Sequence, residues 1–251
     1  MEEIAIKFSI IIPTFNSANV IGNVLESIIS QKENKIEIII MDNMSTDETI
    51  TIVSSYQAKL KNDNNIRIYI FSEKDEGCYD AMNKSLNHIT GNWILFLGSD
   101  DMLIPNSLRN AKKYLKYDNV IYYGNSYRPS ENKLYDGKFD KLKLCTKNIN
   151  HQCILYPSIV FSKNRYNTKY KILADYNLNI QLFGNKDFTY KYIPILITYY
   201  EDIKKGMSGL NRDEIFYADK PLIIKTNFGI LYYIYLKTRY GCGNLIRKIC
   251  Q

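Results

Sequence analysis

The sequence predicts an α/β fold whose central sheet is mostly parallel and flanked by helices. Apolar, β-branched runs of strand length alternate with helical patterns, at intervals of about 25–30 residues. Repeated strand–helix–strand units of this kind give a parallel sheet with right-handed crossovers. Polar or acidic residues follow each of the first four strand-like runs. Because these strand ends share one edge of a parallel sheet, we expect the ligand site there.

The first half of the chain, residues 1–115, carries this pattern most clearly. Strands are predicted over 7–12, 36–41, 66–71 and 91–97, and helices over 20–31, after the polar segment 45–49, over 79–88 and over 103–115. Asn16 or Ser17 is placed to cap the first helix, and Pro105 stands near the first turn of the last one.

The second half, residues 116–218, has a weaker pattern, which predicts a small β/α region. We expect a strand over 120–123, a hairpin or long loop over 124–150, a strand over 153–161 interrupted at Pro157, a helix over 172–183, a β-rich segment over 188–200 and a flexible loop around 206–209. Together the two halves form one predicted domain, residues 1–218, followed by a helical tail, residues 219–251.

The tail is basic, whereas the rest of the chain is nearly neutral. Six of the 33 basic residues follow Asp219, and no acidic residue does. One interpretation is a solvated helix with scattered lysines. The other is a segment that binds an anionic membrane surface, since residues 228–236 are apolar and aromatic between Lys225 and Lys237. No nucleic-acid partner is expected, because the charge is sparse.

The remaining composition narrows the class of protein. The five cysteines are odd in number and include no CxxC pair, so neither a disulfide framework nor a zinc site is indicated. The amino terminus lacks the pattern of a signal peptide, and no window approaches the roughly 20 apolar residues of a membrane span. The expected location is the cytoplasm, with the cytoplasmic face of the inner membrane as the place for a membrane-bound fraction.

Two adjacent carboxylates follow the fourth predicted strand. Five apolar residues, 93–97, give way at once to Gly98, Ser99, Asp100 and Asp101. Such a pair suits Mg²⁺ or Mn²⁺ carrying a phosphate-bearing substrate. The alternative is a polar turn that closes the strand and caps the next helix.

Three common motifs, two for phosphate binding and one for a catalytic serine, are absent from the sequence. There is no G-x-G-x-x-G after the first strand, no Walker A sequence and no G-x-S-x-G elbow. What remains is a carboxylate-rich edge without a glycine cradle for phosphate, where a metal ion can bind the phosphate instead.

Four motifs in order resemble the GT-A glycosyltransferases of family 2, inverting enzymes that include many bacterial polysaccharide and O-antigen transferases. Residues 10–16 (IIIPTFN) resemble the opening strand and turn, and 40–47 (IMDNMSTD) the second motif. Residues 72–84 (SEKDEGCYDAMNK) match a subgroup pattern closely, and 97–101 (LGSDD) stand where the family has D-x-D. The resemblance covers residues 7–115 firmly and implies a Rossmann-like GT-A fold.

The resemblance implies roles for the nucleotide-side residues. Thr14 and Asn16 line the nucleotide pocket, Asp42 accepts a hydrogen bond from the base, and Asp75 lies under the nucleotide and donor sugar. Lys84 is a candidate phosphate or carboxylate partner.

The resemblance also implies the metal ligands. Asp100 meets Mn²⁺ or Mg²⁺ with Asp101 beside it, although Gly98 occupies the position of the family's first acid. Asp80 is a candidate for the donor sugar or acceptor. The alternative for Asp80 and Lys84 is a simple i,i+4 helix pair.

On the acceptor side, Asp175 lies in the A-D-Y-N-L context that the family uses for its catalytic base. The alternative is that Asp175 merely caps a helix. His151 and Gln152 are candidates to border the donor sugar or acceptor, although a lone histidine is more often structural. Arg212 follows a loop that resembles the family's closing loop and is a candidate for the diphosphate.

The predicted function is inverting transfer of a sugar from a nucleotide-sugar, with UDP expected, to a glycan or polyprenyl-diphosphate-linked acceptor in the synthesis of cell-surface polysaccharide, O-antigen or lipopolysaccharide. One alternative is a non-catalytic nucleotide-sugar-binding subunit, which Gly98 makes worth testing. A nucleotidyltransferase is disfavoured, because its glycine-rich basic loop is absent.

Overall fold

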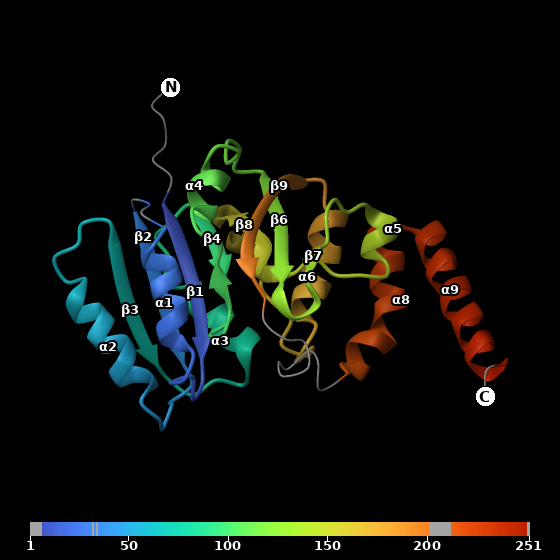
Figure 1. Ribbon diagram of the computed structural model, residues 1–251. Coiled ribbons are helices and arrows are strands. Elements are labelled where there is room, and N and C mark those ends of the chain that lie inside the picture. The colour runs from blue at the N-terminus through green and yellow to red at the C-terminus, as the bar shows by residue number, and fades with distance from the viewer. Residues whose placement is uncertain (1–6, 32, 34, 201–211, 250–251) are drawn as a thin grey trace.

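The computed structural model describes residues 7–31, 33, 35–200 and 212–249, with the backbone alone from 240 (Figure 1). The strands are β1 (Phe8–Thr14), β2 (Ile36–Asp42), β3 (Ile66–Ser72), β4 (Trp93–Phe96), β5 (Met102–Leu103), β6 (Val120–Arg128), β7 (Lys133–Tyr135), β8 (Ile154–Pro157) and β9 (Thr189–Tyr199). The helices are α1 (Ile21–Ile29), α2 (Thr49–Lys59), α3 (Cys78–Ser85), α4 (Ser107–Lys112), α5 (Lys141–Leu144), α6 (Ala174–Gly184), α8 (Glu214–Phe228) and α9 (Ile230–Ile249), with 3₁₀ turns at η1 (Pro129–Glu131), η2 (His151–Cys153) and η3 (Ser158–Ser162).

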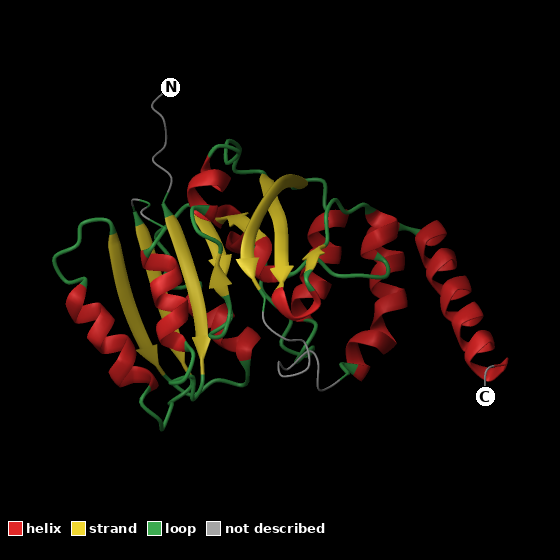
Figure 2. Ribbon diagram, viewed as in Figure 1, coloured by secondary structure: helices red, strands yellow, loops and turns green. Residues whose placement is uncertain are grey.

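The first four strands form the parallel part of the sheet, as predicted. β1 pairs with β2 and β4, and β2 pairs with β3, all in parallel. Their side chains alternate between two core clusters. Ile10 and Ile12 face α1, α2 and α4, whereas Ile11 faces α3 and α6. Because both faces of β1 and β2 are covered by helices (Figure 2), these strands read as unbroken apolar runs.

The second half continues the sheet with mixed pairing. The strand order is β3-β2-β1-β4-β8-β6-β9-β5, with β7 paired to β6. β8 is antiparallel to β4 and β6, and β9 is parallel to β6. The arrowheads of β1, β3, β6 and β9 therefore point to the same edge, the lower one in Figure 1. The result is the mostly parallel, helix-flanked α/β sheet that the sequence predicts.

Two element predictions need correction, and the hairpin prediction is confirmed. The predicted helix over 103–115 is too long, because Leu103 belongs to β5, which pairs with β9, and α4 begins only at Ser107. Pro105 disfavours the helical conformation of the residue before it, and Asn106 is left-handed with φ of 60°. The predicted strand over 153–161 is β8 alone, followed by η3. The predicted hairpin or loop over 124–150 contains the β6–β7 hairpin and α5.

The two carboxyl-terminal helices pack onto the second half. Phe216, Ile224 and Phe228 of α8 and Leu236 of α9 join the core cluster that contains α6. The predicted boundary between 218 and 219 therefore falls inside α8. Lys220, expected among the tail's surface charges, is instead 1% exposed. None of the helices that the structure describes is long and apolar enough to cross a membrane.

Candidate active site

The carboxyl ends of β1, β2 and β3 place three polar residues side by side. Thr14 is level with Asp42, and Asp42 with Ser72. Asp42 is fully buried, and its carboxylate accepts hydrogen bonds from the Thr14 hydroxyl at 3.3 Å, the Ser72 hydroxyl at 2.7 Å and the Ser45 backbone N–H at 2.9 Å. Asp42 thus joins three strand ends and the loop after β2.

Asn16 joins the loop after β1 to the loop after β2. Its side-chain oxygen accepts from the Thr46 N–H at 2.9 Å, and its own N–H donates to the Ser45 hydroxyl at 2.9 Å. The prediction that Asn16 or Ser17 caps the first helix is wrong. The N-cap of α1 is Val20, without a side-chain cap, and the Ser17 hydroxyl donates to Ser99 at 2.9 Å. The side chains are used to tie loops together.

Asp75 lies in the turn between β3 and α3. Its N–H donates to the Asn43 side chain at 2.8 Å, and its carboxylate accepts from the Gly77 N–H at 2.7 Å. Burial raises the pKa of Asp75, and the charges of Asp80 and Asp42 raise it further. Asp75 is therefore close enough to Asp42 to feel its charge.

Asp80 and Lys84 form the i,i+4 pair that the alternative interpretation predicts. Their charged groups are 3.3 Å apart, and the Lys84 ammonium also lies 3.6 Å from Glu73 and donates to the Lys74 carbonyl at 2.7 Å. Asp80 accepts from the Glu76 N–H at 3.0 Å. Both side chains thus bind their own segment.

Asp100 and Asp101 lie in a tight turn after β4. The Asp101 N–H donates to the Gly98 carbonyl at 3.2 Å, and the Gly98 N–H donates to the Asp101 carboxylate at 3.1 Å. A Cβ on Gly98 would lie 2.8 Å from Asp101 Oδ2 and 3.0 Å from Asp100 Oδ1. The two carboxylates therefore fold back over the space that a side chain at position 98 would fill.

The electrostatics of this pair suit a cation. Asp101 is buried while Asp100 is exposed, and burial together with the Asp100 charge raises the pKa of Asp101 to about 7. Within the described residues no group of three His, Cys, Asp or Glu side chains is arranged to hold a metal ion. Asp100 and Asp101 fit a divalent cation that takes its other oxygen ligands from a substrate and water.

Asp175 lies in the first turn of α6, buried among hydrogen-bond partners. The Asn148 amide donates to it at 2.8 Å, His151 Nδ1 lies 3.4 Å away, and the Tyr79 hydroxyl lies 2.9 Å from Oδ1 and 2.8 Å from the Ile172 carbonyl. These contacts fix the orientation of the carboxylate.

The alternative interpretation, that Asp175 caps a helix, holds in part: Asp175 is not the N-cap of α6, but its Oδ1 accepts from the Tyr176 N–H in the first turn at 2.7 Å. The N-cap position is Leu173, and the carboxylate that accepts from the N–H groups of Ile172 (2.9 Å) and Leu173 (3.1 Å) belongs to Asp213. Asp213 also caps α8 by accepting from the Phe216 N–H at 3.1 Å. Asp175 thus uses Oδ1 on its own helix, while its Oδ2 meets the side chains of Asn148 and His151.

His151 lies beside this carboxylate in η2, and Gln152 follows it in the same turn. Burial alone would lower the pKa of His151, but the hydrogen bond and charge of Asp175, aided by Asp101 and Asp100, raise it overall. The Gln152 amide nitrogen is buried and has no hydrogen-bond partner among the described residues. The roles of His151 and Gln152 in binding the donor sugar or acceptor stay predictions.

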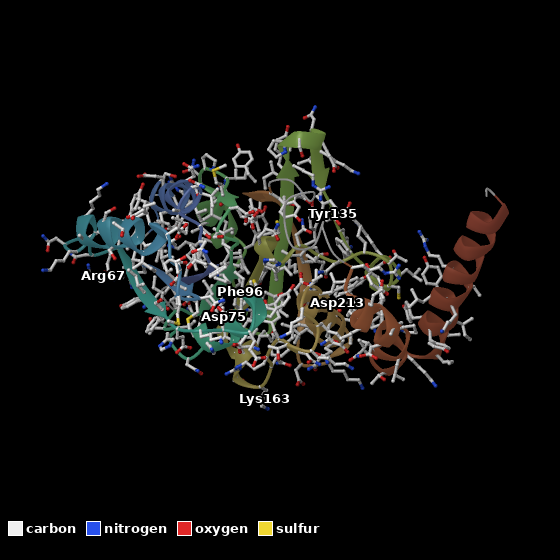
Figure 3. The ribbon with its side chains drawn as sticks, turned by 90° about the horizontal axis from the view of Figure 1, so that it is seen from below. Arg67, Asp75, Phe96, Tyr135, Lys163 and Asp213 are labelled. Carbon is white, nitrogen blue, oxygen red and sulfur yellow. The ribbon has the colours of Figure 1, made fainter. Side chains whose placement is uncertain are left out.

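Cys78, at the start of α3, lies within electrostatic range of carboxylates from both halves of the chain. Burial raises the pKa of its thiol to about 12, and the charges of Asp175, Asp75, Asp100 and Asp101 contribute in that order. Four carboxylates from both halves of the sheet therefore lie within electrostatic range of one side chain. Figure 3, viewed from below, shows Asp75 near this edge, with Asp213 on the side of the second half.

No described contact joins Arg212 to the carboxylates around Cys78. Its side chain is exposed, 3.3 Å from Glu214 and over the ring of Tyr217. The predicted closing loop around 206–209 lies outside the described residues. Sequence reasoning missed Asn148, Asp213 and the role of Tyr79. Tyr79 was visible within the third motif, but no sequence signal marked the other two.

The chain matches a known family over most of its length. Residues 9–184 match the family described as Glycosyl transferase family 2. A PGL/p-HBAD biosynthesis glycosyltransferase of Mycobacterium bovis is 35% identical over 238 residues, which is 93% of this chain and 90% of the relative. An uncharacterized glycosyltransferase of Rickettsia prowazekii is 32% identical over 194 residues, covering 70% of this chain and 58% of the relative.

Solved structures share the fold at low sequence identity. TarS of S. aureus, residues 1–349, superposes with a TM-score of 0.65 and 18% identity, covering 87% of this chain and 69% of that one. A mannosyltransferase of Pyrobaculum calidifontis, in complex with GDP-Man and Mn²⁺, gives a TM-score of 0.64 and 18% identity over 94% of this chain and 80% of that one.

Proposed function

The chain belongs to glycosyl transferase family 2, and from that premise we propose that it is an inverting enzyme that moves a sugar from a nucleotide-sugar to a glycan or lipid-linked acceptor. A UDP-sugar is the expected donor, and a polyprenyl-diphosphate-linked glycan of a cell-surface polysaccharide or O-antigen is the expected acceptor. The name of the mycobacterial relatives supports a glycoconjugate product, and TarS in complex with UDP-GlcNAc supports a UDP-sugar.

The nucleotide-binding role belongs to the ends of β1, β2 and β3. We assign Thr14 and Asn16 to the wall of the nucleotide pocket, with Asp75 beneath the nucleotide and sugar. Asp42 is assigned to binding the nucleobase, and its four internal hydrogen bonds hold the loop that would support that nucleobase. Arg212 remains a proposal for the diphosphate.

Asp100 and Asp101 would hold Mn²⁺ or Mg²⁺. When bound, a divalent cation supplies positive charge that stabilises the leaving diphosphate. The raised pKa of Asp101, caused by burial and by Asp100, supports this assignment, because two adjacent carboxylates are costly to ionise without a cation. Mn²⁺ in the Pyrobaculum mannosyltransferase supports it as well.

Asp175 is the proposed general base. It takes the proton of the acceptor hydroxyl while that oxygen bonds to the anomeric carbon and the bond to the diphosphate breaks on the opposite side. Tyr79, Asn148 and His151 hold the carboxylate in place, and the Gln152 amide is a donor for a sugar hydroxyl. The observation that carries the proposal is that Tyr79 of α3 and His151 hold the Asp175 carboxylate, while the charges of Asp175, Asp75, Asp100 and Asp101 all reach Cys78, the neighbour of Tyr79.

Replacing Asp175, the proposed general base, tests the proposal. The purified protein is incubated with UDP-sugars and Mn²⁺, and release of UDP is measured with and without acceptor. Asp175→Asn should lower transfer by about 10³-fold while donor binding stays unchanged. Asp187→Asn, an exposed carboxylate just after the same helix, is the matched control and should transfer at the normal rate. Near-normal transfer by Asp175→Asn would contradict the assignment of the base.

Slow hydrolysis of the donor tests inversion directly. NMR of the sugar first released, read before mutarotation, should show the anomer opposite to that of the donor. Retention of the donor's configuration would contradict the proposed displacement.

A non-catalytic nucleotide-sugar-binding subunit is the alternative, and Gly98 in place of the family's first acid is the observation that favours it. Such a subunit would bind the UDP-sugar and release no UDP in the same assay, with or without Mn²⁺. A nucleotidyltransferase would require a nucleoside triphosphate.

A further inference from the structure

The outer face of α9 is apolar although it packs against nothing that the structure describes. Leu231 is 76% exposed, and Ile230 and Ile234 are each 51% exposed. At 100° per residue these three side chains lie within one arc of the helix. Leu236, which is fully buried, points to the opposite side, toward the core. The helix therefore buries one apolar face and presents a second one to its surroundings.

The position of α9 leaves this second face open. The helix lies at the end of the molecule away from β3, beyond α8, and its long axis runs beside α8 (Figure 1). Single exposed apolar side chains are ordinary on a protein surface, but three on one helical arc at the edge of a molecule indicate a docking surface.

The charges around this face are all of one sign. The ammonium groups of Lys225 and Lys237 each lie 5.8 Å from the ring centroid of Tyr233, which adjoins Ile234. Arg239 follows and is exposed. No acidic residue occurs anywhere after Asp219. Cationic side chains and a tyrosine ring around an apolar centre match an anionic lipid surface, where the ring and ammonium groups meet the headgroups.

We infer that α9 docks the protein on an anionic lipid surface. Ile230, Leu231 and Ile234 enter the boundary between headgroups and acyl chains, while Lys225 and Lys237 pair with lipid phosphates. A second copy of the chain is a poorer partner, because a symmetric contact through this face would bring like charges together. Nucleic acid is poorer still, because it offers no apolar surface for the centre of the face. Lys220 is buried and takes no part.

Vesicle co-sedimentation of the full chain without any sugar donor tests the inference independently of the proposed catalysis. The protein should bind vesicles of phosphatidylglycerol mixed with phosphatidylcholine, and not vesicles of phosphatidylcholine alone. Leu231→Glu/Ile234→Glu should weaken binding at least about tenfold. Leu134→Glu, on β7 and 57% exposed, is the matched control and should bind like the original protein. Each of Lys225→Gln and Lys237→Gln should weaken binding about fivefold.

Three results would overturn the inference. The first is equal vesicle binding by Leu231→Glu/Ile234→Glu and the original chain, with circular dichroism showing both folded. The second is equal binding to charged and uncharged vesicles. The third is absence of vesicle binding together with a dimer, detected by light scattering, that the double variant abolishes.

Discussion

Asp42 and Asp175 are both buried carboxylates of the proposed site, but different parts of the chain hold them. The partners of Asp42 are Thr14, Ser45 and Ser72, which adjacent strand ends and the following loop deliver by backbone register. The partners of Asp175 are Tyr79, Asn148 and His151, which come from α3, an irregular segment and η2. The first half of the molecule thus positions its acid through the sheet, and the second half through side-chain contacts between distant segments.

The comparison predicts that Asp42 matters most for stability. Asp42→Ala leaves three hydroxyl groups and one backbone N–H without their acceptor, and hydrogen bonds to a charged group are each worth about 1.5–3 kcal/mol. We expect the free energy of unfolding to fall by about 4 kcal/mol, measured by urea denaturation. Asp118→Ala, at an exposed turn, should change it by less than about 0.5 kcal/mol. A loss for Asp42→Ala as small as that of the control would show that register alone holds the three strand ends.

Lys220 provides the corresponding test in the second half. Its ammonium is buried 4.4 Å from the ring centroid of Tyr176, the residue after Asp175, and burial lowers its pKa to about 8. The unfolded chain keeps this proton up to about pH 10.5. Between these two pH values the unfolded chain binds more protons than the folded protein, so the contribution of Lys220 to stability rises with pH.

Lys220→Met removes the cost of burying this charge. We expect the variant to be more stable below pH 8, by up to about 3 kcal/mol, and the difference from the original protein to shrink as pH rises from 8 to 10.5. Urea denaturation at several pH values measures both effects. A variant less stable than the original at pH 7 would mean that the cation–ring contacts with Tyr176 outweigh the desolvation of the ammonium.

Tyr79→Phe tests whether side-chain contacts position the base. The ring remains in the core, and only the hydroxyl shared between Asp175 and the Ile172 carbonyl is lost. We expect kcat to fall about tenfold, which is about 1.4 kcal/mol, with the donor KM unchanged. Tyr69→Phe, on the exposed side of β3, is the control. A rise in KM at constant kcat would instead place the Tyr79 hydroxyl in substrate binding.

The same contrast explains what could be predicted from the sequence. Strand periodicity and the polar residues after each strand locate Thr14, Asp42, Asp75 and Asp100 at one edge, because parallel strands put their ends together. The start of α4 was missed, because local conformation at Asn106 and a two-residue pairing with β9 decide it. The roles assigned to the site residues stay predictions until substrate experiments are made.

The acceptor side needed contacts that no local pattern encodes. Asp213 binds the N–H groups of Ile172 and Leu173, just before α6, from about 40 residues further along the chain, where a sequence window sees only a cap for its own helix. Asn148 lies in a segment without periodicity, so nothing in the sequence links it to Asp175.

Lys84 lies on the nucleotide side but is held by side-chain contacts, and its replacement gives the smallest expected effect. The residue belongs to the motif that carries Asp75, yet the contacts that the described part of the chain gives its ammonium are with Asp80, Glu73 and the Lys74 carbonyl of its own segment. Because both members of the Asp80 pair are partly exposed, Lys84→Gln should change the free energy of unfolding by no more than about 0.5 kcal/mol. The donor Kd, measured by titration calorimetry with UDP-sugar and Mn²⁺, should stay within about twofold, since ion pairs of this kind contribute less than 1 kcal/mol. A loss of donor affinity of tenfold or more would instead make Lys84 a phosphate partner, released from its helix when the donor binds, and the nucleotide side would then also depend on contacts beyond strand register.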